Sequence, residues 1–104
     1  MEEREGRSEP YHYVELAQLS VSTTDASYEF ERKPDLIKVQ NTHASSAIYI
    51  TFDKVASTTN SYVVPAGGER EFVLDARTVH AIVSTSTATL CICGLAYEDV
   101  RLKA

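Results

Sequence analysis

The feature that most constrains how this chain can fold is the alternation of apolar and more polar residues over short runs. In the clearest run, residues 47–52, the apolar Ile48, Ile50 and Phe52 occupy every second position. Successive side chains of a β-strand point to opposite faces of a sheet, so this period of two predicts a strand that buries one face. An amphipathic helix would need apolar residues three and four positions apart instead. The chain is therefore predicted to consist mainly of β-strands.

Similar alternation recurs along the chain, and polar turn sequences separate the runs. A tight turn is expected at Pro65–Gly68, because proline presets the backbone for a turn and glycine tolerates positive φ. Residues 84–87 have the composition of a hairpin connection between the last two strands. The two candidates for a helical turn are 15–19 and 99–104. The expected strands are 11–16, 27–30, 36–41, 48–52, 62–64, 71–74, 79–83 and 89–97.

About seven or eight short strands at intervals of roughly ten residues predict an all-β fold with antiparallel pairing, either a sandwich or a small barrel. We predict a single antiparallel β-sandwich of the jelly-roll or Greek-key type over residues 11–104. Residues 1–10 are charged and contain nothing to bury, so they are predicted to form an extended N-terminal arm. A chain of 104 residues buries enough surface to fold without a metal or a disulfide.

The net charge of −5 argues against several classes of partner. DNA, RNA and anionic lipids attract a surplus of Lys and Arg, and the chain has no basic stripe. No apolar run approaches the roughly 20 residues that span a bilayer. The N-terminus also lacks the apolar stretch of a signal peptide. We therefore expect no nucleic-acid partner and no membrane association.

The cysteines and histidines do not form a recognisable metal motif. Cys91 and Cys93 should share one face of a strand, where a disulfide between them would be strained. They are expected to be reduced, buried thiols, as in a reducing cytosol. His12, His43 and His80 are not at metal-ligand spacing. A zinc site combining a histidine with both thiols is the alternative, although structural zinc prefers Cys-x-x-Cys. No metal and no cofactor are expected.

The sequence contains no arrangement typical of an enzyme. No serine lies in a Gly-x-Ser-x-Gly elbow, and a small sandwich rarely has a cleft for paired carboxylates. Gly67–Gly68 is too short to cradle a phosphate and has no lysine motif after it. We predict that the protein is not an enzyme and has no catalytic residues.

Six tyrosines and no tryptophan suggest surfaces for contact with other molecules. Tyr49 should face away from the core, and Tyr11 and Tyr13 follow the charged arm. Exposed tyrosines are frequent at protein interfaces and also stack on sugars. Alternatively, each ring covers a sheet edge and leaves only its hydroxyl in water. The predicted interface residues are Glu2, Glu3, Arg4, Arg7, Tyr11, Tyr13 and Tyr49.

Three segments carry a resemblance to a known group of proteins: Val39–Asn41, Ile48–Phe52 and Pro65–Gly68. Together they give a strand ending in Asn, a strand of the form apolar-Tyr-Ile-x-Phe, and a Pro-x-Gly-Gly turn before another strand. In this respect residues 36–97 resemble the small β-sandwich virion proteins of tailed bacteriophages, which decorate or cement capsids or attach near the tail. The resemblance implies no catalytic residues. The arm and the tail from Glu98 depart from the pattern.

The resemblance implies a structural virion protein of the capsid decoration or cement type. Such a protein binds major capsid subunits, stabilises the shell, forms a homo-oligomer, and is located in the virion after assembly in the host cytoplasm. Two alternatives remain. One is a tail, collar or fibre component of the virion that contacts host glycans, and the other is a cellular β-sandwich interaction module.

Overall fold

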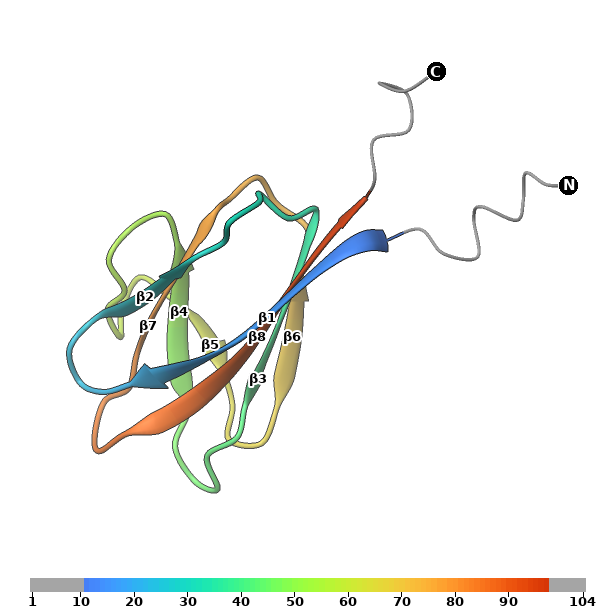
Figure 1. The fold of residues 1–104 in the computed structure, drawn as a ribbon. Coiled ribbons are helices and arrows are strands. Elements are labelled where there is room, and N and C mark those ends of the chain that lie inside the picture. The colour runs from blue at the N-terminus through green and yellow to red at the C-terminus, as the bar shows by residue number, and fades with distance from the viewer. Residues whose placement is uncertain (1–10, 98–104) are drawn as a thin grey trace, which may run out of the picture.

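The computed structural model describes residues 11–97, which fold into two antiparallel sheets (Figure 1). No helix occurs within these residues, so the predicted all-β fold is confirmed. The predicted arm, residues 1–10, and residues 98–104 lie outside the described residues. The strands are β1 (Tyr11–Val21), β2 (Ala26–Glu29), β3 (Leu36–Asn41), β4 (Ile48–Phe52), β5 (Tyr62–Val64), β6 (Glu69–Phe72), β7 (Thr78–Ile82) and β8 (Ala88–Tyr97).

The order of the strands makes this sandwich a jelly roll. Sheet A has the order β1-β8-β3-β6, and sheet B has the order β2-β7-β4-β5. Apart from the β4–β5 connection, which stays within sheet B, the chain passes from one sheet to the other at each connection. This alternation is the pattern of an eight-stranded jelly roll built from two Greek keys. The predicted jelly-roll sandwich with antiparallel pairing is confirmed.

The prediction of a hairpin connection at residues 84–87 is wrong. These residues join β7 in sheet B to β8 in sheet A, so the connection crosses between the sheets. Ser86 has a φ of 59° in this connection, a left-handed conformation that non-glycine residues adopt mainly in turns. Turn composition indicates that the chain reverses, but it does not indicate which strand the next one will pair with.

The core lies between the sheets and consists of inward-facing aliphatic and aromatic side chains. Ile37 and Val39 of β3, and Ile48 and Ile50 of β4, are buried at alternate positions as predicted. Full burial of a side chain of this size contributes about 1.5–3 kcal/mol. The other buried members of the core are Val21, Phe30, Val64, Phe72, Val79, Ala81, Val83, Ala88, Leu90 and Ile92.

β1 extends further than the alternation at its start predicts. It continues to Val21 and pairs with β8 along its length, so the helical turn considered at 15–19 is wrong. Ala17 and Leu19 pack against the core, whereas Leu16 points to the opposite face. Leu, Ala and Gln favour helices on their own, but the backbone pairing with β8 overrides this local preference.

Two polar turns close one end of the sandwich. The predicted turn at Pro65–Gly68 is confirmed: Gly67 has a φ of 71°, and the Gly68 N–H donates to the Pro65 carbonyl at 2.8 Å. The fully buried Asn41 organises the adjacent turn after β3. Its amide nitrogen donates to the carbonyls of Ser46 and Val64, at 2.8 and 3.0 Å. All its polar partners are therefore within the protein, as a buried amide requires.

Candidate interaction surface

The outer face of sheet A carries an apolar patch at one end. The pairing register places Val14 of β1, Leu95 of β8 and Leu36 of β3 in one row across three strands. In the next row Leu16 lies opposite Cys93. Val14 is 54 % exposed and Leu16 is 74 % exposed, although both are aliphatic. These five residues are called the sheet A patch below.

Beyond the patch the same face becomes polar, both along the strands and towards β6. Lys38 of β3 continues the row of Cys93 and forms an ion pair with Glu71 of β6, with 3.6 Å between the charged atoms. The following row consists of Gln18, Cys91, Gln40 and Glu69. The face thus combines an apolar end with a polar margin, the composition that protein–protein interfaces have at their core and rim.

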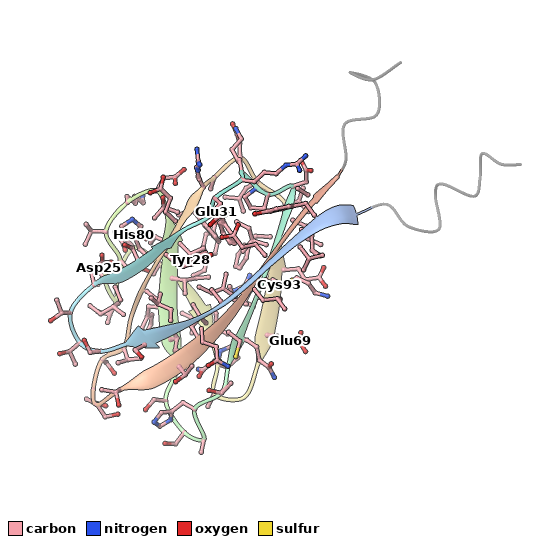
Figure 2. The ribbon with its side chains drawn as sticks, viewed as in Figure 1. Asp25, Tyr28, Glu31, Glu69, His80 and Cys93 are labelled. Atoms are coloured by element: carbon pink, nitrogen blue, oxygen red, sulfur yellow. The ribbon has the colours of Figure 1, made fainter. Side chains whose placement is uncertain are left out.

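A hollow of about 460 Å³ lies over the middle of this face, along β8. Cys91 and Cys93 line it from the central strand, while Leu16 lines it from β1 and Glu69 from β6. Figure 2 labels Cys93 on β8 and Glu69 on β6. The hollow is a shallow trough in a sheet surface, with β1 on one side and β3 and β6 on the other.

The two thiols in this trough are free and share the outward face of β8, as predicted, but they are half-buried at the surface of the sheet and are not part of the core. Burial raises the pKa of the Cys93 thiol, and the nearby Lys38 only partly opposes this effect. The thiolate is the nucleophilic form of cysteine. Cys93 is therefore protonated at neutral pH and is poorly suited to nucleophilic chemistry.

The tyrosines predicted to form an interface lie in different parts of the molecule. Tyr13 belongs to a cluster between β1 and β2, formed with Glu15, Tyr28 and Glu31 and called the rim below. Its hydroxyl donates to Glu15 at 3.1 Å, and its ring centre is 5.1 Å from the guanidinium carbon of Arg32. Tyr49 points outward from β4, as predicted, and is half-buried on sheet B. The structure does not bring the two together. The other predicted residues lie outside the described residues or side chains: Glu2, Glu3, Arg4, Arg7 and Tyr11.

Glu15 is the centre of this rim, where it contacts Tyr28 and Glu31, both labelled in Figure 2. Its carboxylate accepts hydrogen bonds from the hydroxyls of Tyr13 and Tyr28. It also accepts the backbone N–H of Glu31, whose nitrogen lies 3.1 and 3.2 Å from the two carboxylate oxygens. Partial burial works to raise the pKa of Glu15, but these hydrogen bonds outweigh it and the pKa is lowered. The carboxylate joins three segments of the chain, so its role is structural.

Asp25 and His80 form a second polar pair on the outer side of sheet B. The Nδ1 atom of His80 is 2.9 Å from Asp25, and because a carboxylate only accepts hydrogen bonds, Nδ1 carries the proton. The other oxygen of Asp25 accepts from the backbone N–H of Ala56 at 2.9 Å, which holds the β4–β5 loop against the sheet. Ser27 lies opposite His80 in the register. Among the described residues, however, no hydrogen bond links a serine to this ring, so the pair lacks an activated nucleophile.

The remaining features concern metal-binding side chains and membrane spans. Within residues 11–97 there is no group of three or more His, Cys, Asp or Glu side chains that could hold a metal ion. His43 serves its own turn, since its Nδ1 accepts the backbone N–H groups of Ser45 and Ser46. The described part of the chain also has no helix of the length and apolarity that a membrane span requires.

The sheet A patch was not recognised from the sequence. Alternation places Val14 and Leu16 on the face of the first strand opposite Tyr13, but nothing in the sequence indicates that Leu36 and Leu95 lie beside them. Their proximity depends on β8 being placed between β1 and β3. The available signal was the presence of aliphatic residues at alternate positions on both faces of the first strand.

Comparison with known proteins identifies the fold and no family. No protein-family model matches the chain, and no curated protein matches its sequence. Among solved structures, it is similar to a conserved protein of unknown function from Streptococcus pyogenes, with a TM-score of 0.54 and 12 % identity over 84 % of this chain and 68 % of that one.

Two other solved structures are more distant. One is of Bacillus endospore appendages, described as disulfide-linked pili, with a TM-score of 0.49 and 15 % identity over 82 % of this chain and 85 % of that one. The other is a cupin superfamily protein from Desulfitobacterium hafniense, with a TM-score of 0.47 and 17 % identity over 80 % of this chain and 67 % of that one. At such identities a shared fold does not indicate a shared function.

Proposed function

We propose that this protein is a non-catalytic structural protein of a virus particle, and that it binds other virion proteins through the outer face of sheet A. The observation that carries the proposal is the sheet A patch, where Val14 and Leu16 remain largely exposed next to half-buried Leu36 and Leu95. Apolar side chains that gather on one rigid face, with charged residues at its margin, are typical of a protein-binding surface.

The polar groups with chemical potential support a binding role more than a catalytic one. Glu15 is fully occupied by hydrogen bonds in the rim, and Asp25 holds both His80 and the backbone of Ala56. Burial raises the pKa of Cys93, which keeps that thiol protonated at neutral pH. Both carboxylates therefore have structural partners, and none of the three groups is prepared for proton transfer to a substrate.

The specific role that the sequence resemblance favours is capsid decoration or cementing. A decoration protein repeats the same contact many times on a symmetric shell, so a weak contact at each copy gives strong attachment overall. A rigid sandwich with one adhesive face suits this role. The partner would be the major capsid protein or another virion protein.

The proposal is tested by analysing particles from the culture that expresses this gene natively. Particles are purified on a density gradient, and the chain and the major capsid protein are quantified by mass spectrometry. We expect the chain in the particle fraction at a fixed ratio to the major capsid protein. A chain found only in the soluble fraction would contradict a virion role.

The arm is examined in the same assay. Deleting residues 1–10 should release the protein from particles while leaving its circular-dichroism spectrum unchanged, because the buried core of the described residues runs from Val21 to Ala96. Deleting residues 98–104 is the matched control at the other end. Normal decoration by the chain that lacks residues 1–10 would rule out a role for the arm.

The alternative, a tail, collar or fibre component that contacts host glycans, is favoured by a different surface. Tyr49 projects from sheet B between Val63 of β5 and Ile82 of β7, where its ring is available for stacking on a sugar. Selective binding on a glycan array, lost in Tyr49→Ala, would support this role. A ratio of about one chain per particle tail, instead of a ratio set by the capsid subunits, would also support it.

A further inference from the structure

The four sheet edges of the described chain are not equally protected. An edge strand presents unpaired backbone groups, and proteins prevent unwanted pairing there by making the strand short, charged or interrupted by proline. β2 and β6 have four residues each, and β5 has three. Pro65 follows β5 directly, and β6 carries Glu69, Arg70 and Glu71. These three edges are therefore poor templates for another strand.

β1 is the exception. It has eleven residues, it pairs with β8 on one side, and within residues 11–97 no strand pairs with its other side. Its outward side chains at positions 14, 16, 18 and 20 carry no charge. The charged residue at its centre, Glu15, points inward, and its carboxylate is held by Tyr28 and the Glu31 backbone. The edge thus combines length, exposed apolar surface and no charge directed at an incoming strand.

We propose that β1 is a dimerisation edge, along which two copies of this chain pair antiparallel to form one continuous eight-stranded sheet. A second copy is the occupant that fits, because no other described edge matches the length of β1 and an antiparallel pair of identical strands closes by two-fold symmetry. Leu16 is the middle residue of β1, with five strand residues on either side. A two-fold axis beside Leu16 therefore pairs every residue of the strand.

The side chains are compatible with this register. It places Leu16 opposite the partner's Leu16, and Val14 opposite the partner's Gln18, so the two sheet A patches adjoin. It also places Glu15 opposite the partner's Ala17, a small uncharged residue. Moving the axis by one residue, to Glu15, would set two carboxylates opposite each other, and like charges directly across a strand pair are destabilising. Charge and length both favour the axis at Leu16.

The inference does not rest on the proposed virion role, since pairing of β1 requires no particle and is measured on the purified chain. The first experiment is sedimentation equilibrium. The wild-type chain should sediment at about 23 kDa, twice the 11.5 kDa of one chain. Leu16→Lys, which introduces two like charges at the axis, should sediment as a monomer. Val73→Lys is the matched control, because Val73 is 82 % exposed and lies outside β1. This control should remain dimeric.

The second experiment tests the register by oxidative cross-linking in a Cys91→Ser, Cys93→Ser background. Leu16→Cys should form a disulfide-linked dimer at least tenfold faster than Val14→Cys or Gln18→Cys, because only position 16 faces itself across the axis. A wild-type monomer at about 100 μM, or a dimer that Leu16→Lys leaves intact, would overturn the proposal. Faster cross-linking at position 14 or 18 would overturn the proposed axis. Circular dichroism confirms that each variant is folded.

Discussion

Gly94 shows how closely single residues are packed between the sheets. It lies on the inward face of β8, where a Cβ atom would come within 2.5 Å of the ring of Phe30. Phe30 is only 1 % exposed and packs edge-on against Tyr28, with 5.3 Å between ring centres. The ring therefore cannot move into open space to accept an added methyl group.

We expect Gly94→Ala to lower the free energy of unfolding by about 1–3 kcal/mol, the usual cost of overpacking a core. Urea denaturation of the purified chain measures this change. Phe30→Leu replaces the ring with a smaller side chain, so Gly94→Ala should cost clearly less in that background. If the two substitutions are fully additive, Gly94 and Phe30 do not interact in the way described.

Glu15 and Tyr28 make stability depend on pH in the alkaline range. The hydrogen bond to Glu15, assisted by burial, raises the pKa of Tyr28 from 10.0 to about 12. An unfolded chain releases this proton near pH 10, whereas the folded chain retains it. The contribution of Tyr28 is therefore complete below pH 10 and is lost as the pH rises towards 12.

In Tyr28→Phe, the free energy of unfolding should fall less steeply between pH 10 and 12 than in the wild type, and it should be lower at pH 7. Tyr62→Phe, which also removes one tyrosine hydroxyl, is the control and should keep the wild-type slope. At the acid end, the lowered pKa of Glu15 adds stability that is lost as the pH falls below about 4.5. Identical alkaline slopes in all three proteins would show that Glu15 does not hold the Tyr28 proton.

At the scale of elements, alternation was sufficient where a strand buries one face and exposes the other. The strands at 36–41, 48–52 and 62–64 have the predicted bounds. β6 was predicted two residues late, because Glu69, Arg70 and Glu71 lie on an edge strand and give no apolar alternation. The rim and the Asp25–His80 pair could not be predicted, since each joins residues that only the strand order brings together.

Asn41 links three elements, and its removal should be costly. Its amide donates to the carbonyls of Ser46 and Val64, and its side-chain oxygen accepts the His43 N–H at 2.8 Å. Asn41→Ala leaves these groups without their partner, and each buried unsatisfied group costs about 1–3 kcal/mol. We expect the free energy of unfolding, measured with urea, to fall by at least about 2 kcal/mol, which corresponds to two such groups. Gln40→Ala, at the exposed neighbouring position, should change stability by less than about 0.5 kcal/mol. Equal effects would contradict the assigned role.

At the scale of the whole molecule, the two sheets have different outer faces. The β4–β5 loop covers part of sheet B, held there by Asp25 and Ala56, whereas sheet A carries the exposed patch and the trough along β8. The sequence predicts a sandwich with protein-binding surfaces, but the residue pattern places those surfaces at tyrosines and not on sheet A. Which face is free depends on where each loop folds back, and this is a property of the assembled fold.

This difference leads to a prediction about which face contacts a particle. Leu95→Glu places a carboxylate in the centre of the sheet A patch without touching the core, because Leu95 points outward from β8 between Val14 and Leu36. Burying an unpaired charge in an interface is strongly unfavourable. We expect co-sedimentation with particles to fall at least tenfold. Val63→Glu is the matched control on sheet B, where Val63 is 42 % exposed, and it should bind as the wild type does. Loss of binding in Val63→Glu, with normal binding by Leu95→Glu, would assign the contact to sheet B.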